Sequence, residues 1–315
     1  HSEYLVRTDT KMAVGQKTVL GRTQAEPALG FVEHDKVVAR ALHFGEADLH
    51  AIDYRSWIAP VAGHFSGPHH TEIANTFQGA AMHDLSLFPI TRKWPARHPD
   101  RLQLYSLPTP NGVKASIMLE ETGLPYEPHL VSFETNDQLT PEFLSLNPNN
   151  KIPAIIDPDG PDGQPLALFE SGAILVYLAE KTGRFLPPGA AARYETLQWL
   201  MWQMGGVGPM FGQLGFFHKF AGKDYEDKRP RDRYVAESKR LLGVLEQRLA
   251  GRRWVMGEDY TIADIAIFPW VRNLVGFYGA GELVEFDRFP QVQRVLAAFV
   301  ERPAVQRGLA VPSQR

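Results

Sequence analysis

The side chains with the clearest chemical potential lie in the stretch Thr109-Pro110-Asn111-Gly112. A helical pattern follows this turn, so its hydroxyl and amide can both donate hydrogen bonds to a bound thiol and hold it as the reactive thiolate. The chain contains no cysteine, which excludes disulfides, thiolate metal sites and catalysis through a protein thiol. Chemistry on a captured small-molecule thiol is not excluded. Thr-Pro-Asn-Gly is equally a common turn sequence, so the residues alone leave both interpretations open.

Two further stretches present groups that suit a peptide ligand. Glu170-Ser171 opens a predicted helix, whose free amides and partial positive charge favour a carboxylate, while Glu170 can hold an ammonium group. Simple capping by Ser171 is the alternative. Ile152-Pro153 belongs to a predicted strand, where a cis bond would turn the Ile152 backbone outward toward an extended peptide. An ordinary trans proline at a strand start is the alternative, which the residues alone favour.

Residues 101–187 contain the elements that must position these stretches. Strand patterns cover 102–107, 126–131, 151–156 and 166–169, and helical patterns cover 113–121, 138–146 and 171–181. The order β-α-β-α-β-β-α predicts a small sheet with helices on both faces.

Residues 190–315 are expected to form an all-α domain, because only helical patterns occur there. These patterns cover 194–204, 231–249, 261–271 and 290–301. The strongest local signal is Thr261-Ile262-Ala263-Asp264, a capping box in which the threonine hydroxyl and the aspartate satisfy each other's backbone amides. We assign it to folding rather than to chemistry.

Residues 1–100 are expected to form a largely irregular N-terminal extension, ending in a linker at 94–99. Its scattered apolar pieces predict an arm packed on the rest of the chain or on a partner subunit, with an independent small domain as the second alternative. Four residues of types that can bind zinc lie close together in the sequence: His64, His69, His70 and Glu72. Because their spacing is irregular and histidine-rich loops are usually only loops, we predict no metal site.

The charge balance and hydropathy exclude several classes of function. The chain has 33 basic and 36 acidic residues, a net charge of −3, so neither nucleic acid nor an anionic membrane is an expected partner. No apolar run approaches the roughly 18 residues that a membrane helix needs. We therefore expect a cytoplasmic protein. The sequence opens on His1-Ser2 rather than methionine, and earlier removal of a leader is left open.

The β-α-β-α-β-β-α unit followed by helices resembles the cytosolic glutathione transferases over residues 101–310. Five stretches carry the likeness: Thr109–Gly112, Asn149–Pro153, Phe169–Gly172, Thr261–Asp264 and Glu301–Ala304. A narrower resemblance, through Thr109–Gly112, Trp199–Gln203 and Gly205–Pro209, is to the bacterial nu class of glutathione-dependent disulfide-bond reductases. It implies a thioredoxin-like glutathione-binding domain at 101–187 and an all-α transferase C-terminal domain at 190–315.

The resemblance also implies roles for individual residues. Thr109 and Asn111 stand where the related thioredoxin fold carries its Cys-x-x-Cys pair, and they would hold the glutathione sulfur. The implied glutathione-binding residues are Gln138, Lys151, Ile152, Pro153, Glu170, Ser171 and Arg233. Gln138 and Lys151 match positions that contact the γ-glutamyl and glycyl ends, and Arg233 matches an arginine that reaches a glutathione carboxylate, in some cases across a dimer. Phe217 and His218 would line the mouth of the site, or serve only in packing.

We therefore predict a homodimeric enzyme that binds one or two glutathiones per subunit and reduces small disulfides. Two alternatives stay open. The first is another glutathione-dependent reaction, either conjugation of an electrophile or cleavage of an aryl ether. The second is a non-catalytic glutathione-binding regulatory protein, which the unusual residues 1–100 favour.

Overall fold

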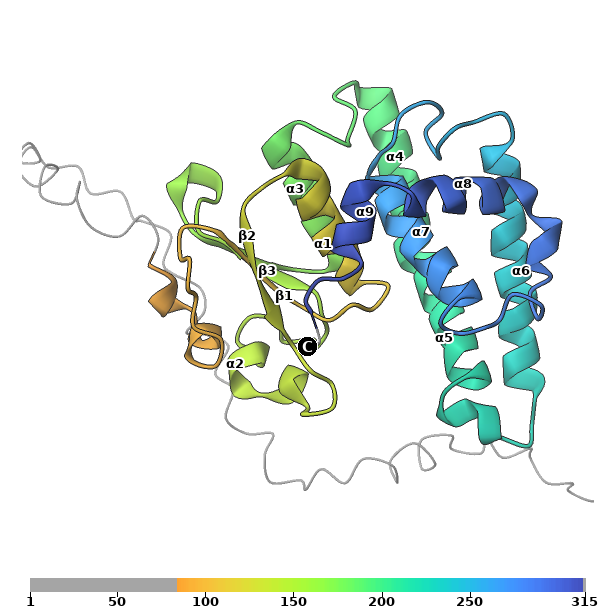
Figure 1. The fold of residues 1–315 in the computed structure, drawn as a ribbon, viewed down its shortest axis with the longest axis horizontal. Coiled ribbons are helices and arrows are strands. Elements are labelled where there is room, and N and C mark those ends of the chain that lie inside the picture. Colours follow the sequence, from red (N-terminus) through yellow and green to blue (C-terminus); the bar gives the residue numbers. More distant parts are fainter. Residues whose placement is uncertain (1–83, 314–315) are drawn as a thin grey trace, which may run out of the picture. The chain divides into compact units, whose positions relative to one another are not determined.

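The computed structural model describes residues 84–313, which form a mixed sheet with flanking helices followed by a helical domain (Figure 1). The strands are β1 (Leu102–Ser106), β2 (Tyr126–Leu130), β3 (Ala154–Asp157) and β4 (Leu166–Phe169), in the spatial order β2-β1-β3-β4. β1 runs parallel to β2, and β3 runs antiparallel to both β1 and β4. The four strand patterns of the sequence are thus all found, although β3 begins only at Ala154.

Helices cover both faces of this sheet, as predicted. Helices α1 (Gly112–Thr122) and α3 (Ser171–Thr182) pack on one face, and the short α2 (Pro141–Leu144) lies on the other (Figure 1). Successive strand residues point to opposite faces. Leu104 accordingly joins the core beneath α1 and α3, and Tyr105 joins a second core with Phe143 of α2. Both side chains are fully buried.

The helix predicted over 138–146 is divided in two. A 3-10 turn spans Asp137–Leu139, and α2 then starts afresh at Pro141. The hydroxyl of Thr140 accepts a hydrogen bond from the amide of Phe143 and caps this second piece. Proline has no amide hydrogen to continue the preceding turn, which explains the break.

The helical domain contains six helices among the described residues: α4 (Ala190–Trp202), α5 (Gly208–His218), α6 (Arg229–Leu249), α7 (Ile262–Val275), α8 (Pro290–Val300) and α9 (Pro303–Gly308). A π-helical turn, Gln203–Val207, joins α4 to α5. Helix α7 is buried over nearly its whole length, and its start carries the predicted capping box, in which Asp264 accepts the amide of Thr261 at 2.9 Å.

Helix α5 was not predicted from the sequence, because its glycines weaken a helical pattern. The structure explains why one of these positions, Gly215, is a glycine. A Cβ atom at Gly215 would overlap the ring of Tyr278, so the glycine permits the close approach of α5 to the chain that follows α7. Tertiary packing thus overrides local propensity in this segment.

Residues 84–98, here called the anchor segment, pack against the thioredoxin-like domain, as the predicted arm would, rather than forming a free linker. Leu85 and Ile90 are buried in the same core as Tyr105 and Phe143. The carboxylate of Glu127 in β2 accepts hydrogen bonds from the backbone amides at positions 97 and 98. The predicted linker at 94–99 is therefore fixed along the edge strand.

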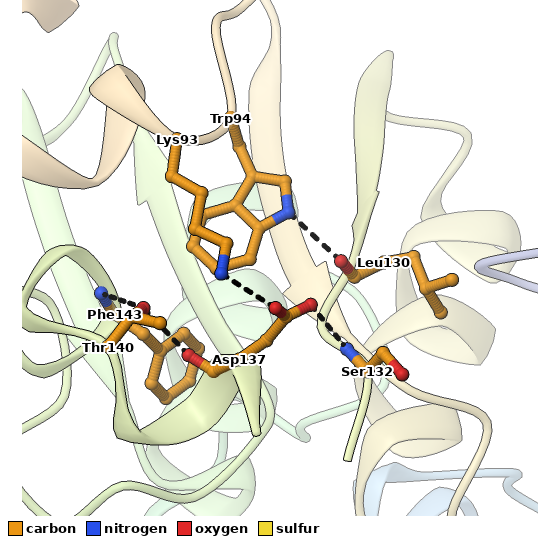
Figure 2. Close-up of polar contacts among 7 residues, drawn as sticks. All are labelled: Lys93, Trp94, Leu130, Ser132, Asp137, Thr140 and Phe143. Carbon is orange, nitrogen blue, oxygen red and sulfur yellow. Dashed lines mark hydrogen bonds and ion pairs between the residues drawn. The ribbon is translucent and has the colours of Figure 1, made fainter. Parts of the chain in front are cut away.

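Two side chains of the anchor segment make further polar contacts, as Figure 2 shows. Trp94 donates its indole N–H to the carbonyl oxygen of Leu130, at 3.0 Å. The ammonium of Lys93 lies 2.6 Å from Oδ1 of Asp137, whose Oδ2 accepts the amide of Ser132 at 2.9 Å. The anchor segment thereby holds the loop that follows β2.

Within residues 84–313, no helix combines the length and apolarity needed to cross a membrane. The same residues contain no group of three or more side chains arranged to bind a metal ion. The histidine cluster at 64–72 and residues 1–83 of the predicted arm lie outside the described residues.

Candidate functional site

A cavity of about 100 Å³ lies between the turn before α1, the turn before β3 and the start of α3. It is lined by Asn111, Asn147, Lys151, Ile152, Pro153, Glu170 and Ser171. Six of the nine residues predicted for the site therefore meet here, from three stretches that are far apart in the sequence. Three chain turns thus converge to give amides, a carboxylate and a hydroxyl around one space.

The turn before α1 leaves the hydroxyl proton of Thr109 available. Its oxygen accepts a hydrogen bond from the amide of Gly112 at 3.2 Å, and a hydroxyl that accepts one bond can still donate another. Gly112 itself is dictated by packing, because a Cβ atom there would overlap the carbonyl oxygen of Leu107. The predicted turn thus also tightens the junction between β1 and α1.

Asn111 lies at the start of α1, where its side chain does not cap the helix. Its Oδ1 instead accepts two hydrogen bonds, from the Lys114 ammonium at 2.9 Å and from the Trp270 indole N–H at 3.0 Å. With its oxygen engaged on the protein side, the amide is arranged to present its N–H groups to the cavity.

The turn before β3 contains a cis peptide bond between Ile152 and Pro153, as predicted. Because β3 begins at Ala154, the N–H and C=O of Ile152 lie outside the ladder of the sheet. The side-chain amide of Asn147 donates to the carbonyl oxygen of Lys151 at 2.6 Å and holds this turn in place. Asn147 lines the cavity and was not predicted.

The start of α3 has an uncommon backbone conformation at Glu170, whose φ of 70° falls in a region that non-glycine residues seldom adopt. Such strain is often concentrated at ligand sites. The Glu170 side chain is exposed and makes no capping bond. The alternative of simple capping by Ser171 is wrong, since its hydroxyl contacts the Lys114 ammonium at 3.3 Å and the sulfur of Met204 at 3.7 Å.

Three predicted site residues do not line this cavity: Thr109, Gln138 and Arg233. Thr109 lies two residues before the lining residue Asn111, in the turn before α1. Gln138 lies in the 3-10 turn before α2, and its Oε1 is buried without a hydrogen-bond partner among the described residues. Arg233 is exposed near the start of α6. Their contacts with glutathione stay predictions.

Phe217 and His218 lie at the end of α5 and are half-buried. The ring of Phe217 stacks on Tyr234 with centroids 5.7 Å apart and meets Tyr225 edge-on at 6.0 Å. For Phe217, packing within the helical domain is thus established, whereas a role at the mouth of the site stays a prediction.

The principal residue that the sequence analysis missed is Lys114, which is fully buried and contacts both Asn111 and Ser171. Burial disfavours the charged ammonium and lowers the pKa of Lys114 to about 7, although the nearby charge of Glu170 opposes this shift. The available signal was a lysine inside the otherwise apolar pattern that begins α1, three residues after Asn111 and thus on the same side of the helix.

Comparison with known proteins agrees with this geometry. Residues 100–180 match the family described as glutathione S-transferase, N-terminal domain, and residues 208–303 match its C-terminal domain. The disulfide-bond oxidoreductase YghU of Escherichia coli is 45% identical over 223 residues, covering 68% of this chain and 75% of YghU. The disulfide-bond oxidoreductase YfcG of the same organism is 44% identical over 209 residues, covering 66% of this chain and 94% of YfcG.

Two similar proteins have been solved with glutathione or glutathione disulfide bound. A glutathione transferase from Burkholderia graminis, with two glutathione molecules per subunit, is 78% identical and has a TM-score of 0.74 over 75% of this chain and 98% of its own. One from Pseudomonas putida, with one glutathione disulfide per subunit, is 74% identical, with a TM-score of 0.71 over 72% and 99%. The chain therefore belongs to the glutathione S-transferase family, a family of enzymes. Its fold class, a thioredoxin-like domain followed by a helical domain, is the one that the sequence predicted.

Proposed function

We propose that this chain is a glutathione-dependent disulfide-bond reductase whose reactive sulfur comes from bound glutathione. The observation that carries the proposal is the cavity itself, which joins Asn111 to Glu170 and Ser171 in a chain that contains no cysteine. The names of YghU and YfcG, and the glutathione disulfide bound to the Pseudomonas putida relative, support it.

Each end of the tripeptide has a suitable partner in the turns around the cavity. The amides that start α3, together with Ser171, suit the γ-glutamyl carboxylate, and the carboxylate of Glu170 suits the α-ammonium group. The outward backbone of Ile152 would pair with the cysteinyl residue as a strand does. Lys151 is exposed at the rim, where its charge would attract the glycyl carboxylate. Gln138 is assigned to one end of the tripeptide by resemblance.

The sulfur would then lie by the turn before α1. Hydrogen bonds from the Thr109 hydroxyl and the Asn111 amide stabilise the thiolate and lower the pKa of the glutathione thiol. This thiolate attacks one sulfur of the substrate disulfide, forming a mixed disulfide and releasing the other sulfur as a thiolate that takes up a proton. A second glutathione thiolate attacks the mixed disulfide at the glutathione sulfur, giving glutathione disulfide and the second reduced thiol. Two electrons pass from two glutathiones to one disulfide.

The second glutathione requires further room and positive charge near the first. Arg233 is proposed to supply that charge in a homodimer. The Burkholderia graminis relative, with two glutathione molecules per subunit, supports this stoichiometry. The homodimer and the cytoplasmic location remain predictions.

The direct test is Thr109→Ala, assayed by stopped-flow reduction of a model disulfide at saturating glutathione. Loss of a hydrogen bond to a charged sulfur should slow the exchange about 10- to 100-fold. Thr109→Ser keeps the hydroxyl and should restore most of the rate. If Thr109→Ala is as fast as the parent, Thr109 has no role in activating the sulfur.

Assays of the parent protein also distinguish a disulfide reductase from the two alternatives, another glutathione-dependent enzyme and a regulatory protein. Turnover of a halonitroaromatic or an aryl ether that exceeds disulfide reduction would contradict the proposal and identify a conjugating or ether-cleaving enzyme. Glutathione binding without turnover of any of these substrates would instead indicate a regulatory protein.

A further inference from the structure

Lys114, in the first turn of α1, lies directly behind the cavity with a completely buried side chain. Its ammonium contacts three neutral oxygens: Oδ1 of Asn111 at 2.9 Å, Oγ of Ser171 at 3.3 Å and Oε1 of Gln203 at 2.6 Å. An ammonium has three N–H donors, so these three oxygens, with the sulfur of Met204 at 3.5 Å, satisfy all of them. Burying a lysine without a directly paired carboxylate is strongly unfavourable, and apolar replacements are often no less stable. The stability of the fold therefore does not explain why a lysine occupies position 114.

The contacts of Lys114 decide which way Asn111 faces. Lys114 and Trp270 both donate to Oδ1 of Asn111. If the side-chain amide flipped, its NH2 group would face these two donors and both hydrogen bonds would be lost. Among the described residues Nδ2 has no protein partner and is not buried away from solvent. The orientation therefore leaves two N–H donors for a ligand in the cavity.

The same ammonium holds the start of α3. It lies 3.3 Å from the Ser171 hydroxyl and thus fixes the residue that begins this helix. Its third contact, Gln203, belongs to the π-helical turn between α4 and α5. One buried charge therefore links both sides of the cavity to the helical domain.

We propose that Lys114 is a positioning residue that orients Asn111 and Ser171 in the glutathione site and whose buried positive charge favours the thiolate form of the bound tripeptide. This inference rests on the proposed function, because it assigns the ligand thiol to glutathione. Lys114 does not itself line the cavity, so it acts through its neighbours and its field rather than by contact with the sulfur.

The electrostatic environment supports this role. The lowered pKa of Lys114, about 7, results from burial, with Glu170 opposing it. The other groups that face the ammonium are uncharged: Asn111 of α1, Ser171 of α3, and Gln203 and Met204 of the π-helical turn. The charge is thus present below about pH 7 and lost above it, so any help that it gives to the thiolate should fade as the pH rises through this value.

The test is Lys114→Met, which keeps the length and apolar stem of the side chain and removes the charge. The pH at which bound glutathione is half ionised should be measured by ultraviolet difference absorbance of the thiolate. We expect this midpoint to rise by about one pH unit, a tenfold loss of thiolate at low pH. Disulfide reduction should fall about tenfold below pH 7 and approach the parent rate at higher pH. Lys223→Met, the same change at an exposed lysine, should alter neither quantity.

A folded Lys114→Met protein whose midpoint and rate match those of the parent would overturn the proposal. If that variant does not fold, Gln203→Leu provides the second test, because it removes a partner of the ammonium and should raise the midpoint in the same direction by a smaller amount. An unchanged midpoint in Gln203→Leu would then overturn it. Failure of the parent itself to bind glutathione in calorimetry would instead refute the proposed function.

Discussion

Trp270 of α7 donates its indole N–H to Oδ1 of Asn111, at 3.0 Å and across 159 residues of sequence. The donor belongs to the helical domain and the acceptor to the turn that begins the thioredoxin-like domain's first helix. The orientation of a residue proposed to hold the sulfur therefore depends on the second domain. A thioredoxin-like domain expressed alone would lose this contact as well as the bond from Lys114 to Gln203.

Trp270→Phe should impair catalysis more than folding. The substitution keeps an aromatic ring but removes one of the two donors that fix Asn111, and a single neutral hydrogen bond is worth about 1 kcal/mol. We expect kcat/KM for disulfide reduction to fall about fivefold. Trp199→Phe is the matched control, since the buried indole N–H of Trp199 has no hydrogen-bond partner among the described residues. Equal losses in the two variants would mean that ring size, and not the bond to Asn111, matters.

Glu170→Gln should weaken glutathione binding without slowing the bound complex. The neutral amide keeps the size of the side chain but loses the charge proposed to hold the α-ammonium group. An exposed charge pair contributes up to about 1 kcal/mol, so we expect the dissociation constant measured by calorimetry to rise about three- to fivefold. The rate at saturating glutathione should stay near that of the parent, because this contact is the same in the ground and transition states.

A ligand lacking the α-ammonium group sharpens the Glu170 experiment. Desamino-glutathione should bind the parent and the Glu170→Gln protein with equal affinity, since neither complex contains the charge pair. Glu226→Gln, at an exposed glutamate of the helical domain, controls for the change in net charge. If the variant discriminates between the two ligands as strongly as the parent does, Glu170 does not bind the ammonium.

The parts of the site that could be predicted are those whose chemistry is local. Thr109-Pro110-Asn111-Gly112 and Glu170-Ser171 each combine a turn or helix start with polar groups in a few consecutive residues, and the cavity brings Asn111, Glu170 and Ser171 together. The resemblance decided between cis and trans at Pro153, because the residues alone favoured trans. Gln138 and Arg233 depended on the resemblance throughout, and the cavity includes neither of them nor Thr109.

Lys114 could not be predicted because its burial is a tertiary property. A lysine in a helical pattern normally lies at the surface, and only the packing of α3 and the π-helical turn around α1 encloses this one. An arm packed on the rest of the chain was predicted for residues 1–100, but the surface on which the anchor segment packs could not be predicted, for a similar reason. Its short apolar pieces, such as those containing Leu85 and Ile90, become a core only against the sheet face that carries Tyr105.

Asp137→Asn tests whether the anchor segment supports the loop that carries Gln138. Burial alone would raise the pKa of Asp137, but hydrogen bonds from the Lys93 ammonium and the Ser132 amide hold it below its ordinary 3.8. A lowered folded-state pKa means that the carboxylate stabilises the fold above pH 3.8 and that this contribution disappears as the pH falls through the folded value. We expect the variant to lose about 1–2 kcal/mol of unfolding free energy at pH 7.

In urea denaturation the same loss should shrink as the pH falls below 3.8, and it should approach zero once the pH is below the lowered folded-state pKa of Asp137, where the parent's own carboxyl is protonated. Lys93→Met should reproduce most of the loss at pH 7, and the double variant should be little worse than either single one, since both remove the same pair. Glu237→Gln, which breaks the more exposed pair with Arg240 on α6, should cost less than about 0.5 kcal/mol. If the loss of unfolding free energy in Asp137→Asn did not depend on pH, its cause would be the substituted amide group and not the missing charge. If the charge does fix this loop, the affinity for glutathione should fall together with stability, because Gln138 is adjacent to the residue that Lys93 holds.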